Sequence, residues 1–192
     1  MRVARCGEVM AAVVVACALA TPARAQNPGP APRVPAAEIG MEPAALVRTS
    51  RGSSSSTALA VPGAGGIGHF TGVYASLFVT REFALEPSLA YLHVSSEISS
   101  AWIGVGTLRA AVYAPGAHVS SAFAFLETGF SGGSDGYGST NDLGAGAGYR
   151  WLVAERHVAL RLEGFYRRWN GSPVETEVGV ALRAGFVLPR AR

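Results

Sequence analysis

The sequence contains no lysine, few charged residues of any kind, and only two cysteines, Cys6 and Cys17, both close to the N-terminus. If the N-terminal segment is removed, the mature chain has no cysteine, which excludes a disulfide framework and thiol chemistry. Charged residues make up 15% of the chain, and every basic residue is arginine. No basic run is interleaved with aromatic residues, so a nucleic-acid partner is excluded.

The positive net charge belongs mostly to the N-terminal segment. The whole chain carries a formal charge of +3, but Arg2, Arg5 and Arg24 against Glu8 account for most of it, and the rest carries +1. The charge therefore gives no reason to expect an acidic partner.

Long hydrophobic runs are also missing after residue 20. The chain is nevertheless apolar, with 49% hydrophobic residues and 24 glycines, and its mean hydropathy is +0.26. A transmembrane helix needs about 20 consecutive apolar residues, and only residues 9–20 approach that length. An apolar chain without a spanning helix favours a barrel that crosses the membrane with strands.

Residues 1–25 are predicted to be a secretory signal peptide. Arg2 and Arg5 supply the positive start, residues 9–20 form the apolar centre, and Ala23-Arg24-Ala25 provides the small-x-small cleavage site. The mature protein is therefore expected to begin at Gln26.

Lipoprotein processing at Cys17, after Val14-Val15-Ala16, is the alternative for this segment.

Residues 26–56 follow and are rich in proline and serine, which predicts a periplasmic linker. Within that linker, Met41–Thr49 fits either a short helix or an extra strand.

From Thr57 onward, apolar and polar residues alternate, as expected for strands whose side chains point to opposite faces in turn. Between His157 and Tyr166, for example, Leu160 and Leu162 share one parity and Arg161 the other. The predicted fold is an all-β, eight-stranded antiparallel up-and-down transmembrane barrel over residues 57–188, followed by a short tail at 189–192. The predicted strands cover residues 57–61, 69–80, 83–94, 102–113, 118–130, 142–152, 158–166 and 178–188.

The predicted connections alternate between short and long. Tight turns are expected at 81–82, 114–116 and 153–156, and longer connections at 62–68, 95–101, 131–141 and 169–174. An even strand count with loops of different length at the two ends is typical of membrane barrels.

The polar parity of the strands combines many small residues with a few charged ones. An eight-stranded barrel has an interior just wide enough to be filled by side chains, and buried Arg and Glu must pair there. Phe123 and Phe125 share the parity of Glu127, and the cost of a charge in lipid favours the lumen for all three. The predicted lumen charge network comprises Glu86, Arg109, Glu127, Arg150, Arg161, Glu163 and Arg183.

The opposite parity is apolar, and its aromatic residues lie near strand ends. These are predicted to form interfacial belts: Phe83, Tyr91, Tyr149, Trp151 and Tyr166. The alternative is a secreted, soluble eight-stranded barrel of the lipocalin or avidin type, whose apolar parity would face a small apolar ligand. Gly, Arg and Glu on the other parity favour the membrane barrel.

Three stretches carry a family resemblance: Phe83–Tyr91 (FALEPSLAY), Leu143–Arg150 (LGAGAGYR) and Leu160–Arg167 (LRLEGFYR). On these, the chain resembles the small outer-membrane β-barrels, the opacity-protein-like porin family of Gram-negative bacteria, over about residues 57–188. The resemblance implies a monomer in the bacterial outer membrane, surrounded by lipid and lipopolysaccharide and inserted by the barrel-assembly machinery. It implies a structural or surface-binding role with no cofactor.

The chain departs from this family at its C-terminus. Such barrels usually end in an aromatic residue that the assembly machinery recognises, whereas this chain continues past Phe186 and Leu188 to Arg192. Either Phe186 or Leu188 serves as the signal from an internal position, or the insertion signal is weak.

An enzymatic alternative comes from a second resemblance, to the lipid A deacylases among small outer-membrane barrels, which use a His-x-Ser pair and a carboxylate. The candidates here are His93 and Ser95 with Glu97, and His118 with Ser120. In the deacylases the pair lies late in the chain, where this sequence reads Arg-Trp-Asn. We therefore predict a protein without enzymatic activity, and the four scattered histidines predict no metal site.

Overall fold

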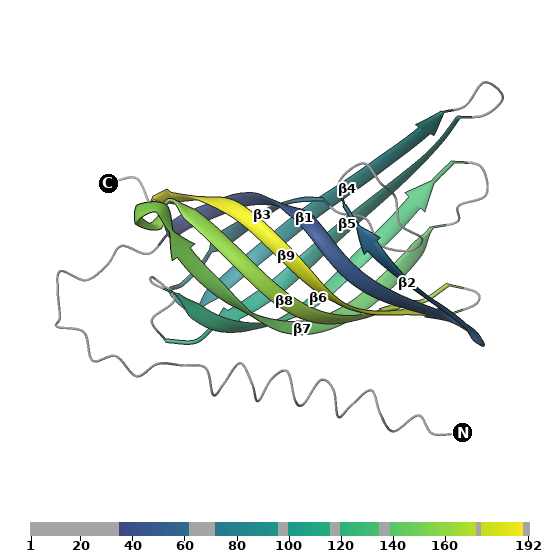
Figure 1. Ribbon diagram of the computed structural model, residues 1–192. Coiled ribbons are helices and arrows are strands. Elements are labelled where there is room, and N and C mark those ends of the chain that lie inside the picture. Colours follow the sequence, from purple (N-terminus) through teal and green to yellow (C-terminus); the bar gives the residue numbers. More distant parts are fainter. Residues whose placement is uncertain are drawn as a thin grey trace.

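The computed structural model describes residues 35–61, 72–95, 100–115, 120–134, 139–171 and 174–189. They form one antiparallel sheet, shown in Figure 1. Its strands are β1 (Pro35–Arg51), β2 (Ser54–Ala60), β3 (Val73–Phe78), β4 (Phe83–Ser95), β5 (Ser100–Tyr113), β6 (Ser121–Gly133), β7 (Thr140–Val153), β8 (Val158–Trp169) and β9 (Glu175–Pro189). None of the described residues forms a helix long and apolar enough to cross a membrane.

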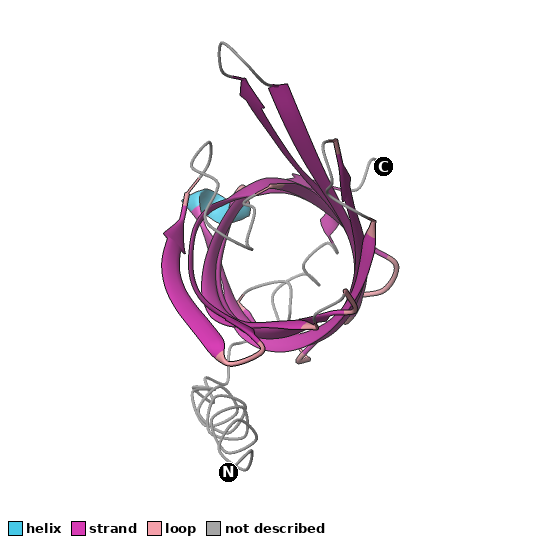
Figure 2. Cartoon of the chain, turned by 90° about the vertical axis from the view of Figure 1, so that its right-hand side faces the viewer, coloured by secondary structure: helices cyan, strands magenta, loops and turns pink. Residues whose placement is uncertain are grey.

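The sheet closes into a barrel through β1. Strands β3 to β9 pair in chain order, and β1 pairs with β9 from Pro35 opposite Pro189 to Arg51 opposite Glu175. Figure 2 shows the strands as a closed ring. The predicted fold class, a closed eight-stranded antiparallel barrel, is confirmed.

One of the eight strand positions is built from two segments. The second half of β1, residues 45–51, pairs with β2, whereas residues 37–41 pair with β3. β2 and β3 thus follow one another along the same edge of β1. The prediction that residues 57–61 and 69–80 are two adjacent barrel strands is therefore wrong, because both run antiparallel to β1 and share one position.

The eighth strand position is filled by β1, which the sequence prediction did not include as a strand. The prediction of a linker over residues 26–56 is therefore wrong from Pro35 onward. For Met41–Thr49, the extra strand is correct and the short helix is not. Pro43 lies between Met41 and Ala44, where the pairing of β1 with β9 has a register shift. On the other edge of β1, the partner strand changes from β3 to β2 at the same place. A proline without an N–H is tolerated at such a bulge, so the barrel begins at Pro35 instead of Thr57.

The remaining predicted segments lie partly outside the described residues. These are residues 1–34, with the signal peptide and its lipoprotein alternative, and residues 190–192 of the tail. The prediction of a signal peptide therefore stays a prediction.

The two ends of the barrel differ. At one, called the turn end, lie the start of β1, the end of β9 and the connections after β3, β5 and β7. The last of these contains the short 3₁₀ turn Ala154–Arg156. At the other, the loop end, lie the connections after β4, β6 and β8 and the tight β1–β2 turn, where Gly52 has a φ of 59° that favours glycine. Figure 1 shows β4 and β5 extending furthest beyond the barrel at the loop end.

Candidate functional site: the charged lumen

Inward-pointing side chains fill the barrel with charge. All seven residues of the predicted network lie inside, together with five further charged residues. Among the described residues, the buried charged set is Glu38, Glu42, Glu86, Arg109, Glu127, Asp142, Arg150, Arg161, Glu163, Arg167, Glu177 and Arg183. Every strand of the barrel except β2 and β3 contributes at least one of them, and β3 contributes hydroxyl groups.

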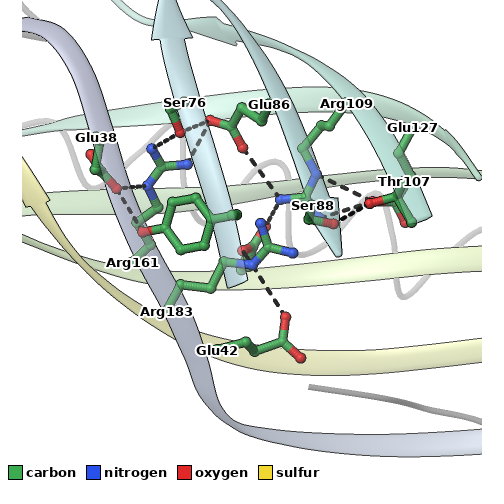
Figure 3. Close-up of polar contacts among 12 residues, drawn as sticks. Glu38, Glu42, Ser76, Glu86, Ser88, Thr107, Arg109, Glu127, Arg161 and Arg183 are labelled. Carbon is green, nitrogen blue, oxygen red and sulfur yellow. Dashed lines mark hydrogen bonds and ion pairs between the residues drawn. The ribbon is translucent and has the colours of Figure 1, made fainter. Parts of the chain in front are cut away.

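Arg161 is the centre of the cluster nearest the turn end (Figure 3). Its Nε lies 2.8 Å from a carboxylate oxygen of Glu38, and its Nη1 donates to Glu86 at 2.6 Å. Its Nη2 donates to the hydroxyl of Ser76 at 2.8 Å. The second oxygen of Glu38 accepts from Nε of Arg150 at 2.9 Å. We call Glu38, Glu86, Arg150 and Arg161 the turn-end cluster.

Aromatic side chains complete this packing. The Tyr74 hydroxyl donates to Glu38 at 2.7 Å, and the Tyr113 hydroxyl donates to Glu86 at 3.0 Å. The guanidinium carbon of Arg161 lies 5.2 Å from the ring centroid of Tyr74, within the range of a cation–π contact. The carboxylates are thus held by neutral donors as well as by arginines.

Arg109 connects the turn-end cluster to the rest of the lumen. Its Nη2 donates to Glu127 at 2.9 Å, and its Nη1 contacts Glu163. The same Nη1 lies 3.8 Å from an oxygen of Glu86. Its guanidinium carbon lies 3.6 Å from the ring centroid of Phe125, which points inward on the same strand as Glu127.

Arg183 extends the network toward the loops, with Nε at 2.6 Å from Glu163 and 3.1 Å from Glu42. Beside it lies a small cavity of about 30 Å³. Its polar lining comes from Glu42, Tyr74, Ser88, Thr107, Arg167 and Arg183.

Arg167 is the arginine closest to the loops in the chain of ion pairs. Its Nη2 lies 3.0 Å from Glu127, its Nη1 3.7 Å from Glu177, and its Nε 3.9 Å from Asp142. We call this part of the lumen the loop-end cluster: Glu42, Arg109, Glu127, Asp142, Glu163, Arg167, Glu177 and Arg183.

The two clusters differ in their contact with solvent. Arg150 and Arg161 at the turn end are fully buried, whereas Arg167 is 7% and Arg183 6% exposed. Even so, Asp142 is only 2% and Glu177 0% exposed, so the charged side chains of both clusters are buried.

Five of the buried charges are absent from the predicted network. Glu38 and Glu42 lie in β1, which was interpreted as a linker. Asp142 is the first residue of the predicted strand 142–152 and lies on its polar parity, but the predicted network does not include it. Glu177 lies on the polar parity directly before the predicted strand 178–188, and Arg167 directly follows the predicted strand 158–166. Including every charged residue of the polar parity, and continuing the alternation by one residue at Arg167 and Glu177, would have found these three.

Glycines make room for the large inward side chains. A Cβ on Gly146 would overlap the ring of Phe125 and the carbonyl oxygen of Gly164, whereas a Cβ on Gly132 would meet nothing within 4 Å. We expect Gly146→Ala to lower the free energy of unfolding by about 1–3 kcal/mol through overpacking. Urea unfolding of the refolded barrel measures this, with Gly132→Ala as the matched control. Equal stability of the two variants would contradict the packing argument.

The outward parity is apolar, and the five residues of the predicted belts all lie on it. Tyr91 is 65% exposed and stacks on Trp102 with ring centroids 6.4 Å apart. Tyr149 packs against Trp151 at 4.9 Å. Phe83, Tyr149 and Trp151 lie toward the turn end of their strands, and Tyr91 and Tyr166 toward the loop end.

This polarity is opposite to that of a lipocalin-type barrel. In such a barrel the apolar parity would enclose the ligand, whereas here Leu126 is 67% and Phe186 70% exposed on the outside. The interior contains buried ion pairs where a cavity for an apolar ligand would lie.

The residues of the enzymatic alternative are not seen together. His93 is exposed on β4, and the Ser120 hydroxyl accepts from the backbone N–H of Leu152 at 3.2 Å. The side chain of Ser95 and all of Glu97 and His118 lie outside the described residues. In the described part of the chain, no group of three His, Cys, Asp or Glu residues could hold a metal ion.

The closed barrel with a charged interior and an apolar exterior is the fold of the small eight-stranded outer-membrane proteins. The chain is similar to neisserial surface protein A, with 10% identity and a TM-score of 0.57 over 79% of this chain and 96% of that chain. It is also similar to OprG of Pseudomonas aeruginosa, with 10% identity and a TM-score of 0.51 over 82% of this chain and 98% of that chain. A third similar structure, Ail of Yersinia pestis, has 16% identity and a TM-score of 0.45 over 79% of this chain and 96% of that chain. No protein-family model and no curated protein sequence matches the chain.

Proposed function

We propose that this protein is a monomeric, non-enzymatic barrel of the Gram-negative outer membrane, with a structural or surface-binding role. The observation that carries the proposal is the inverted polarity of the wall. Charged side chains lie inside and are paired, while large apolar side chains lie outside and exposed. Water would make such an exterior costly, but lipid and lipopolysaccharide would not.

The height of the apolar wall supports the same location. On β4, the outward residues Phe83 and Tyr91 lie eight positions apart, which corresponds to about 26 Å along a strand. With a strand tilt of about 40°, the two rings are separated by about 20 Å along the barrel axis, close to the apolar band of outer-membrane barrels. Aromatic residues at both limits fit the two membrane interfaces.

Fractionation of cells that express the full chain tests this proposal. The protein should sediment with the outer membrane and migrate faster on a gel without boiling than after boiling. Recovery of the mature protein as a soluble periplasmic monomer would refute it. Because ion pairs fill the lumen, planar bilayers with purified protein should show no steady conductance, and a sustained open channel would refute the filled lumen.

A further inference from the structure

Exposed charges are balanced at the turn end of the barrel and basic at the loop end. At the turn end, each exposed arginine of the described residues has a glutamate beside it in the chain, in Arg81-Glu82 and in Glu155-Arg156. At the loop end, three exposed arginines are accompanied by one half-buried carboxylate. The arginines are Arg48, Arg51 and Arg168, and the carboxylate is Glu175. The described outer surface therefore has an excess of positive charge near the loops.

Two of these three arginines, Arg48 and Arg168, face outward without an acidic partner. Arg51 lies opposite Glu175 in the pairing of β1 with β9, and both belong to the parity that faces the lumen. Arg48 and Arg168 belong to the opposite parity, which the exposed leucines of β1 and β8 share. Arg48 donates to the hydroxyl of Ser55 at 3.4 Å, and neither arginine forms an ion pair with a carboxylate of the described residues. Both guanidinium groups are thus available to an external acceptor.

Strand β9 holds Arg48 and Arg168 near each other on the same wall. Arg168 of β8 lies opposite Thr176 of β9, and Thr176 lies opposite Ser50 of β1, two residues from Arg48. Figure 1 shows β1, β9 and β8 running side by side. The two arginines are two strands across and two residues along the sheet from each other, so their backbones are separated by about 12 Å. Side chains of this length both reach a group that lies over β9 between them.

The apolar wall begins directly beside this pair, on the side of the turn end. Arg48 lies opposite Val178, which in turn lies opposite Tyr166, an outward aromatic residue of the kind that marks a membrane interface. In the next outward row toward the turn end, Leu46 is paired with Val180, and these side chains are 55% and 48% exposed. Two uncompensated positive groups therefore lie at the edge of the apolar wall, where the head groups of lipids would lie.

From this geometry we propose that Arg48 and Arg168 together bind a phosphate group of lipopolysaccharide, whose acyl chains cover the apolar wall below. The proposal rests on the outer-membrane location proposed above, in which the longer loops face the outside of the cell. Guanidinium groups bind phosphate through paired, charge-assisted hydrogen bonds. A phosphate monoester carries a charge of about −1.5 to −2 near pH 7, which matches two arginines. The phosphate diester of a phospholipid carries only one negative charge and matches them less well.

Binding of diphosphoryl lipid A, the phosphorylated anchor of lipopolysaccharide, tests the proposal. The refolded barrel in detergent micelles is titrated with this lipid, and native mass spectrometry measures the fraction of protein that carries it. We expect saturable binding to the unaltered protein. In the double variant Arg48→Gln with Arg168→Gln, the apparent affinity should be about tenfold weaker or worse, because charge-assisted hydrogen bonds to the phosphate are lost.

The matched control is the double variant Arg81→Gln with Arg156→Gln, which removes the same charge from exposed arginines at the turn end. It should bind diphosphoryl lipid A as the unaltered protein does. Dephosphorylated lipid A and phosphatidylglycerol should bind the unaltered protein about tenfold more weakly or worse. Equal affinity of the two double variants would overturn the proposal, and so would equal affinity for either of these two lipids.

The outcome is separable from that of the proposed function. Arg48 and Arg168 are exposed, so their double variant should fold, as judged by its faster gel migration without boiling. If it does not fold, the comparison of phosphorylated with dephosphorylated lipid A on the unaltered protein decides. A protein that fractionates with the outer membrane but does not prefer the phosphorylated lipid refutes this site alone, whereas a soluble periplasmic protein refutes the proposed function.

Discussion

Replacing Arg161 with methionine is expected to lower the free energy of unfolding of the barrel by about 3–5 kcal/mol, because two buried carboxylates lose the guanidinium group that they share. Arg161 is fully buried, and its guanidinium group lies within 2.8 Å of both Glu38 and Glu86. Methionine approximates the stem of the side chain, so the loss reports mainly on the charge. Urea unfolding of the barrel refolded in lipid vesicles measures it.

Arg168→Met, seven residues further along β8, is the matched control. Its side chain is exposed, so its effect should stay within about 0.5 kcal/mol. Adding Glu86→Gln to Arg161→Met removes one of the uncompensated carboxylates and should recover part of the lost stability. If the double variant is less stable than Arg161→Met alone, the unpaired-charge explanation is wrong.

Alternation in the sequence was sufficient to separate the two faces of the strands. In β8, Leu160 and Leu162 lie outside, whereas Arg161 and Glu163 lie in the lumen. The period of two is a local property of an extended backbone, so parity can be followed without knowing which strands are neighbours. The antiparallel barrel followed from that parity and from the spacing of the turns. The count of eight came from two errors that compensate, because residues 57–61 and 69–80 share one strand position and β1 was predicted to be a linker.

The prediction failed for the part of residues 26–56 that forms β1, because this segment was assigned from its composition and not from the alternation of its side chains. Prolines made residues 26–56 resemble a linker, yet Pro35 lies at the first position of β1 and Pro43 at its bulge. At both positions a strand tolerates the missing N–H. Glu38 and Glu42 were lost from the predicted network together with the strand.

The partners of the buried charges could not be predicted from spacing. Arg150 donates to Glu38 across 112 positions of the chain, and Arg183 to Glu42 across 141. These pairs depend on the pairing of β1 with β9 and on the stagger between neighbouring strands. The stagger is a property of the whole closed barrel, because it is linked to the number and tilt of the strands.

Replacing Leu126 with arginine should lower the free energy of unfolding in lipid vesicles by about 2–4 kcal/mol, the cost of a charged side chain near the middle of the lipid-facing wall. Leu126 lies in the middle part of β6 and is 67% exposed. It is paired with Ala110 and Ala145 on the neighbouring strands, so the new side chain meets no bulky residue directly across the sheet. The expected loss of stability therefore comes from placing a charge in the surrounding lipid and not from a steric clash.

The same substitution separates the membrane barrel from a soluble one. In water, an arginine in place of an exposed leucine changes stability by no more than about 0.5 kcal/mol. Asn170→Arg, at an exposed position that follows β8 at the loop end, is the matched control and should be close to neutral because it lies outside the apolar band. A loss confined to Leu126→Arg requires that the wall of this barrel faces lipid, whereas equal, small effects of both variants would contradict it.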